Sequence, residues 1–112
     1  MPEKYKEKKV KRAEYTTVKH VPRIKFGLSN NDYCIAKAIY TLSNEPDSAF
    51  PGWYYGKIAT LGQLFNLSRS TAYACVKKLE DTKLIEKNNS TGFLKTTRLW
   101  WEEFESLQIT KK

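Results

Sequence analysis

A run of small hydroxyl residues and cations lies in the middle of the chain, at residues 68–78. Its sequence is Ser-Arg-Ser-Thr-Ala-Tyr-Ala-Cys-Val-Lys-Lys, which supplies hydrogen-bond donors, acceptors and positive charge without a single carboxylate. Side chains of these types can bind phosphate oxygens and the polar edges of nucleic-acid bases. They can act together only if one structural element places them on one face.

An α-helix with two distinct faces is predicted for this run. At about 100° per residue, one side of the helix collects apolar side chains that we expect to be buried. These residues are Ala72, Cys75, Val76 and Leu79. Ser68 precedes the helix and is expected to cap it, with its hydroxyl accepting from a backbone amide of the first turn.

The opposite side of this helix is small, polar and cationic, and it is the predicted binding face. Ser70, Ala74 and Lys77 lie at its centre, with Arg69 and Tyr73 on one flank and Thr71 and Lys78 on the other. We expect base-edge contacts from Ser70, Tyr73 and Lys77 and phosphate contacts from Thr71 and Lys78, while Arg69 is long enough for either. An ordinary solvent-exposed face would also be polar and cationic, and this alternative is strongest for Lys77 and Lys78.

A second helix is predicted just before this one, across a tight turn within residues 61–72. Gly62 lies where the two helices would cross, and its missing side chain permits a close approach. Asn66 lies where the turn needs a left-handed backbone, which asparagine tolerates better than most residues. Gly62, Asn66 and Ser68 together favour a helix-turn-helix over an ordinary helical hairpin.

Residues 83–97 contain two short β-prone runs around Asn-Asn-Ser-Thr-Gly, which predicts a β-hairpin. The order of helices and hairpin resembles the winged helix-turn-helix family. The runs at residues 52–55, 68–71, 84–87 and 91–93 are further similar to the winged-helix domains of plasmid and phage replication initiators and related mobile-element proteins. The resemblance implies that the helix at residues 68–78 enters the DNA major groove. It also implies that the wing, with Lys87, Asn89 and Lys95, contacts the DNA backbone or minor groove.

The flanking segments are predicted to form the scaffold. Ser29 and Asp32 have the spacing of a capping box that opens a helix. Trp100, Phe104 and Leu107 recur at helical spacing and predict a C-terminal helix that packs on the domain. An exposed aromatic stripe at these positions would instead form a dimer interface.

Three consecutive aromatic residues, Trp53, Tyr54 and Tyr55, follow a loop rich in proline and glycine. They could form a base-stacking platform for single-stranded nucleic acid. We favour a short strand that pairs with the wing and covers the core with alternating aromatic side chains.

Residues 15–22 are also expected to be extended, ending at Pro22.

The positive charge of the chain is unevenly distributed. The 112 residues, of 13.1 kDa, carry a formal charge of +8 with a pI near 9.5, which favours a polyanionic partner. Residues 1–25 contain nine Lys or Arg against three Glu, and residues 68–98 contain seven against three acidic residues. We expect residues 1–13 to be a disordered basic tail, either a DNA-binding arm or a solubilising segment, and residues 14–112 to form one winged-helix domain.

The sequence contains no catalytic pattern. It has no nucleophile beside a base, no paired carboxylates in a cleft and no phosphate-binding glycine loop, so we expect no enzyme and no cofactor. His20 is the only histidine and Cys34 and Cys75 are the only cysteines, which predicts two buried free thiols and neither a disulfide nor a metal site. Without a run of about 20 apolar residues or a signal peptide, we expect a cytoplasmic protein and no membrane partner.

The sequence therefore predicts an α+β, mainly α-helical winged helix-turn-helix, with a three-helix core, a β-hairpin wing and a short C-terminal helix. We expect a sequence-specific double-stranded DNA-binding module of a phage or mobile element, acting in replication initiation or transcription regulation. Two alternatives are docking onto another protein and binding of RNA or single-stranded nucleic acid. A homodimer, or a partner replication or regulatory protein, is left open.

Overall fold

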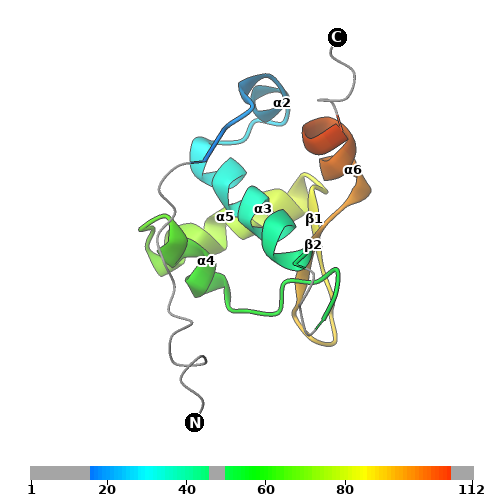
Figure 1. The fold of residues 1–112 in the computed structure, drawn as a ribbon. Coiled ribbons are helices and arrows are strands. Elements are labelled where there is room, and N and C mark those ends of the chain that lie inside the picture. Colours follow the sequence, from blue (N-terminus) through cyan, green and yellow to red (C-terminus); the bar gives the residue numbers. More distant parts are fainter. Residues whose placement is uncertain (1–15, 46–49, 107–112) are drawn as a thin grey trace.

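Helices α3 and α5 pack against each other at the centre of the fold, and the other elements are arranged around them (Figure 1). The computed structural model describes residues 16–45 and 50–106. Its elements in chain order are α2 (His20–Lys25), α3 (Asn30–Ser43), α4 (Ile58–Leu64), α5 (Arg69–Asp81), β1 (Ile85–Lys87), β2 (Leu94–Thr96), α6 (Arg98–Trp100) and the π-helical turn η1 (Trp101–Glu105). The predicted α+β, mainly helical class is confirmed. The predicted tail at residues 1–13 lies outside the described residues.

Helix α3 is the scaffold on which α4, α5 and β2 pack. Its N-terminus is capped and its apolar face is buried. Ser29 Oγ accepts from the amide of Asp32 at 3.0 Å, and Asp32 Oδ2 accepts from the amide of Ser29 at 2.9 Å, which confirms the predicted capping box. The helix contacts α4, α5 and β2, and its Tyr33, Ile35 and Ile39 are fully buried. Burial of each such side chain stabilises the fold by roughly 1.5–3 kcal/mol.

Strands β1 and β2 form the predicted hairpin. They pair antiparallel, with Ile85 opposite Thr96 and Lys87 opposite Leu94. Tyr54 adds a single antiparallel bridge to Leu94, with backbone hydrogen bonds of 2.6 and 3.0 Å. The strand expected to pair with the wing is therefore present as a one-residue bridge.

The three consecutive aromatic residues are divided between two faces by this bridge. Successive side chains of an extended segment point in opposite directions. Accordingly, Tyr54 enters the core and is 7% exposed, whereas Tyr55 is 49% exposed. Coverage of the core is thus confirmed for Tyr54 alone.

The C-terminal helical segment closes the core. The Trp100 and Phe104 side chains are fully buried and stack with ring centroids 4.1 Å apart, and Tyr33 packs against both. The predicted helical spacing is confirmed for these two residues, which belong to the core and are not exposed for a dimer interface. Leu107 lies outside the described residues.

The prediction of an extended segment that ends at Pro22 is wrong for its last three residues. Helix α2 begins at His20 and includes Pro22 in its first turn. Amides of a first helical turn have no carbonyl partner within the helix, so proline costs no hydrogen bond there. None of the helices within residues 16–45 and 50–106 is long and apolar enough to cross a membrane.

Candidate nucleic-acid interface

The turn between α4 and α5 has the geometry that its sequence predicts. Asn66 has φ of 58°, in the left-handed region, and the amide of Leu67 donates to the carbonyl of Gly62 at 2.9 Å. An ideal Cβ placed on Gly62 would lie only 2.9 Å from the Cβ of Ala72. The two helices therefore cross in contact at Gly62, and no other residue fits there without a shift.

Ser68 caps α5, as predicted. Its Oγ accepts from the amide of Thr71 at 3.1 Å and donates to Thr71 Oγ1 at 2.9 Å. The hydroxyl groups of these two predicted contact residues are thus engaged at the start of the helix, where they fix its direction. The predicted apolar face is also confirmed, since Ala72, Cys75, Val76 and Leu79 are all buried.

The outer face of α5 is exposed along its first two turns. Arg69, Ser70, Tyr73, Ala74 and Lys77 are all exposed. The Arg69 guanidinium lies 5.7 Å from the centroid of the Tyr73 ring, which is 45% exposed. Lys77 pairs with Asp81 at 3.6 Å on the open surface, where such a pair is worth about 0–1 kcal/mol and yields readily to another anion.

Lys78 lies differently from the other cations of α5. Its ammonium donates to the carbonyl of Gly27 at 2.8 Å and lies 3.8 Å from Asp32 Oδ2. These contacts hold the side chain against the start of α3. The structure therefore does not bring Lys78 together with Arg69 and Tyr73.

The three predicted wing residues have different surroundings. Lys87 and Asn89 are exposed at the end of β1 and in the turn that follows. Lys95 is half-buried, with its ammonium 4.6 Å from the centroid of the Trp53 ring and 3.5 Å from a carboxylate oxygen of Glu86. Asn88 shapes the tip, because its Oδ1 accepts from the amides of Ser90 and Thr91.

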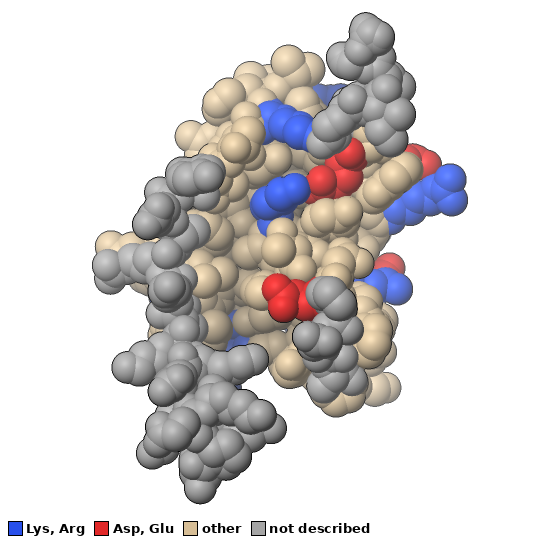
Figure 2. Space-filling view, viewed as in Figure 1, with Lys and Arg blue, Asp and Glu red and all other residues tan. Residues whose placement is uncertain are grey.

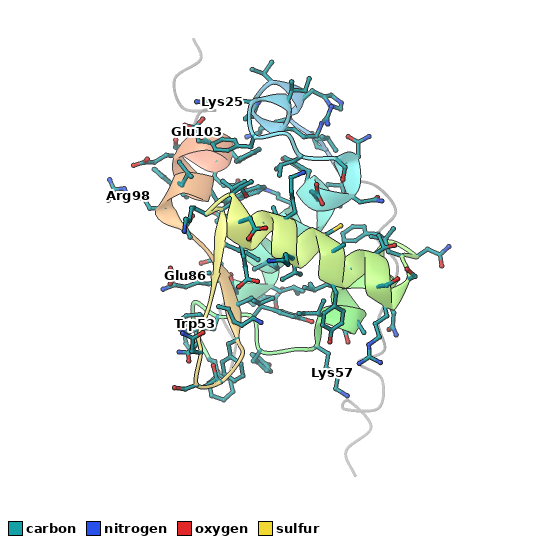
Figure 3. All side chains as sticks on the ribbon, turned by 180° about the vertical axis from the view of Figure 1, so that it is seen from behind. Lys25, Trp53, Lys57, Glu86, Arg98 and Glu103 are labelled. Atoms are coloured by element: carbon teal, nitrogen blue, oxygen red, sulfur yellow. The ribbon has the colours of Figure 1, made fainter. Side chains whose placement is uncertain are left out.

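A hollow joins α4, α5 and the tip of the β1–β2 hairpin. Its walls include Lys57, Gln63, Arg69, Tyr73 and Gly92. In Figure 3, α5 crosses the front of the molecule, the hairpin lies beside it, and Lys57 extends away below. Lys57 and Gln63 are not predicted from the sequence, because a residue just before a short helix and a lone polar residue within it carry no periodic signal.

Unpaired positive charge occurs at this hollow. Within the described part of the chain, neither Lys57 nor Arg69 forms an ion pair with a carboxylate. The face over α3, in Figure 2, instead carries basic and acidic side chains next to each other. The hollow is therefore a place where an anion would meet charge that the protein itself does not neutralise.

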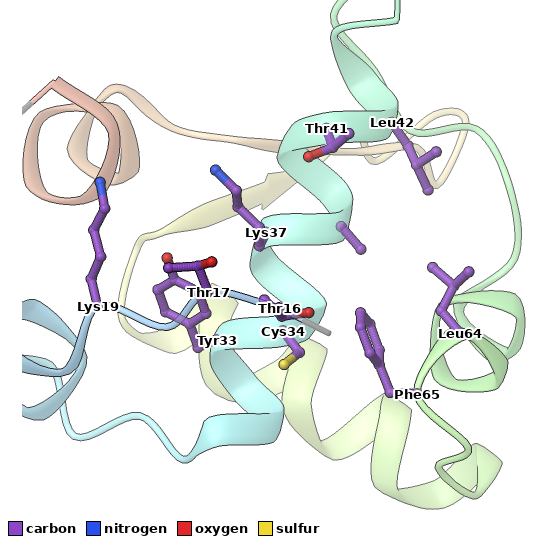
Figure 4. A pocket seen from close by; sticks show the side chains of 11 residues that line it. Thr16, Thr17, Lys19, Tyr33, Cys34, Lys37, Thr41, Leu42, Leu64 and Phe65 are labelled. Carbon is purple, nitrogen blue, oxygen red and sulfur yellow. The ribbon is translucent and has the colours of Figure 1, made fainter. Parts of the chain in front are cut away.

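A second hollow, of about 600 Å³, lies between residues 16–19, α3 and the end of α4 (Figure 4). Its two cations are engaged within the protein: Lys37 pairs with Glu105 at 2.9 Å, and Lys19 donates to the carbonyl of Phe104. Burial raises the pKa of the Cys34 thiol above its ordinary value. The side chain of Cys34 is only partly buried, so the prediction of two buried free thiols is confirmed for Cys75 alone.

The Cys75 thiol lies in the core beside Asp32. Burial, with a smaller contribution from its hydrogen bond to Asp32, raises the pKa of Cys75 to about 12. The thiol is therefore protonated at neutral pH. No cluster of three His, Cys, Asp or Glu side chains suited to a metal ion occurs among residues 16–45 and 50–106.

Comparisons with known proteins give no match to this chain among protein-family models, curated proteins or solved structures.

Proposed function

We propose that this chain is a winged helix-turn-helix domain that binds double-stranded DNA, with α5 in the major groove and the β1–β2 hairpin as the wing. The observation that supports it best is the exposed outer face of the first two turns of α5, on which Arg69 forms no ion pair with a carboxylate of the described residues. Ser70 and Ala74 are small, so the helix presents little bulk to a groove about 12 Å wide. Gly62 meets α5 at Ala72, which is on the buried side of the helix and not on this outer face.

Individual roles follow from where the side chains lie. We assign base-edge contacts to Ser70, Tyr73 and Lys77, and a phosphate contact to Lys57, whose ammonium extends from the same hollow. Arg69 reaches either kind of partner. Lys78 is assigned to the scaffold, because its ammonium is already bonded to Gly27.

The wing supplies the second part of the proposed interface. Lys87 and Asn89 are exposed near its tip and are assigned to the DNA backbone or minor groove. Lys95 already contacts Trp53 and Glu86 and is a weaker partner for DNA. The resemblance at residues 52–55, 68–71, 84–87 and 91–93 supports a role in replication initiation or transcription regulation of a phage or mobile element.

Selection of bound duplexes from a random pool, followed by affinity measurements, tests the proposal. Arg69→Ala should cost about 1–3 kcal/mol on the enriched duplex and relax one base position if Arg69 contacts a base, or weaken all duplexes equally if it contacts a phosphate. Arg98→Ala is the matched control, since Arg98, on α6, is also exposed but pairs with Glu102 of η1 at 2.7 Å. This control should bind as the wild type does.

A second pair of variants tests the role of Lys57. Lys57→Ala should weaken enriched and scrambled duplexes alike and reduce the slope of log affinity against log salt by about 0.9. Lys25→Ala, at the opposite end of the molecule in Figure 3, should change neither quantity. If folded variants of Arg69, Tyr73 and Lys77 all bind normally, α5 is not the interface, and docking onto a protein becomes the better explanation. Preference for single-stranded RNA over duplex DNA would favour the RNA-binding alternative.

A further inference from the structure

Four aromatic side chains lie together on the outer side of the hairpin and are not used by the proposed duplex interface. We call them the aromatic face: Phe50, Trp53, Tyr55 and Phe93. The pleat explains the grouping, because the bridged pair Tyr54 and Leu94 points into the core and the residues next to each point outward.

Three of the four rings, those of Phe50, Tyr55 and Phe93, form one cluster, and Trp53 lies against Lys95. The Phe50 ring centroid lies 5.2 Å from that of Tyr55 and 4.9 Å from that of Phe93, and Tyr55 and Phe93 are 6.2 Å apart. Phe50 is 47% exposed and Tyr55 is 49% exposed, while Trp53 and Phe93 are half-buried. Contiguous exposed apolar surface of this kind marks a binding site more often than isolated exposed rings do.

Charge around the aromatic face favours an anionic occupant. The Lys95 ammonium lies 4.6 Å from the Trp53 ring centroid, and the unpaired Lys57 follows Tyr55 by two residues. Glu86 pairs with Lys95 at 3.5 Å, so the charge available to an anion here is that of Lys57. A second copy of a chain with a net charge of +8 would bring like charges together, whereas a nucleic acid offers phosphates to Lys57 and planar bases to the rings.

A duplex cannot use this surface well, because its base faces are covered by their neighbours in the stack. Unpaired nucleotides expose those faces, and aromatic side chains bind them with little dependence on sequence. We propose that the aromatic face binds single-stranded nucleic acid, with bases stacked on Tyr55 and phosphates near Lys57. This site shares Lys57 with the proposed duplex interface, but its rings do not belong to the outer face of α5, and it does not require that α5 bind duplex DNA.

Fluorescence anisotropy with the full chain tests this site. The probes are an oligothymidylate of about 15 nucleotides and an abasic oligomer of equal length, which has the same phosphates but no bases. The wild type should bind the oligothymidylate more tightly than the abasic oligomer. Tyr55→Ala should lower affinity for the oligothymidylate by about 5-fold to 100-fold and leave abasic binding unchanged, while Tyr55→Phe should retain tight binding.

Trp101→Ala is the matched control, because Trp101 is also an exposed aromatic residue, at 46%, but belongs to η1. It should not change oligothymidylate binding. Equal affinity of the wild type for both probes, or equal losses from Tyr55→Ala and Trp101→Ala, would overturn the inference. So would a dimer in sedimentation that Tyr55→Ala dissociates. Circular dichroism melting establishes that each variant is folded.

The same titrations separate this inference from the proposed duplex binding. Arg69→Ala should weaken duplex binding and leave the preference for oligothymidylate over the abasic oligomer intact. If no duplex is bound but Tyr55 still determines that preference, the aromatic face stands and the duplex proposal fails. If Tyr55→Ala weakens a blunt duplex as much as the oligothymidylate, the aromatic face is part of a duplex interface and the inference fails.

Discussion

Replacing Gly62 with alanine tests the crossing of α4 and α5 directly. The added Cβ would lie 2.9 Å from the Cβ of Ala72 and 3.2 Å from the carbonyl oxygen of Leu67, well inside the optimal separation of about 3.5–4.0 Å. Ala72 is fully buried and has no rotamer that could yield. Overpacking of this kind costs about 1–3 kcal/mol, and the better helix propensity of alanine returns about 0.8–1.0 kcal/mol. We therefore expect Gly62→Ala to lower the free energy of unfolding by up to about 2 kcal/mol.

Urea unfolding followed by circular dichroism measures this loss, and two further variants calibrate it. Ala74→Gly, at an exposed position of α5, should cost about 1 kcal/mol from helix propensity alone. The double variant Gly62→Ala, Ala72→Gly removes the opposing methyl group, so its double-mutant cycle should give a favourable coupling of about 1 kcal/mol or more. If Gly62→Ala instead stabilises the protein by as much as Ala74→Gly destabilises it, the helices do not approach closely and the reasoning is refuted.

Three other predictions concern the core, the charge and one buried thiol. Leu79→Ala should lower the free energy of unfolding by about 2–5 kcal/mol, because Leu79 is fully buried. Lys77→Ala should change the free energy of unfolding by less than about 0.5 kcal/mol. Equal losses in urea unfolding would contradict the assigned faces of α5. The log affinity for duplex DNA should fall with log salt at a slope of about −0.9 per neutralised phosphate. Deletion of residues 1–13 should weaken binding to all duplexes similarly. Salt-independent binding in titrations would count against the interface. Burial raises the pKa of Cys75 from 9.0 to about 12, so the unfolded chain releases a proton that the folded chain keeps, and stability should fall as pH rises between these values. Cys75→Ala should make that fall in the urea midpoint shallower, and an unchanged pH dependence would contradict the assignment.

Local rules were enough to predict the elements that form the candidate site. The left-handed Asn66, the Ser68 cap and the buried side of α5 all depend on spacing and backbone preference within a few residues, and each is confirmed. The capping box at Ser29 is confirmed for the same reason. Pro22 shows the limit of such rules, because proline is compatible both with the end of an extended run and with the first turn of a helix.

The tertiary structure alone decided which side chains share a surface. Periodicity places Lys78 on the flank of α5, but the carbonyl of Gly27, 51 residues earlier, determines where its ammonium lies. The three consecutive aromatic residues have no assigned faces until Tyr54 pairs with Leu94.

Lys57, Arg69 and Gly92 likewise come from three segments that meet only when α4, α5 and the hairpin pack together. The sequence by itself therefore determined the elements, their caps and the buried side of α5, since these depend on neighbours within about one or two helical turns. The grouping of charges and rings into surfaces depends on residues distant in the chain, and only packing brings those together.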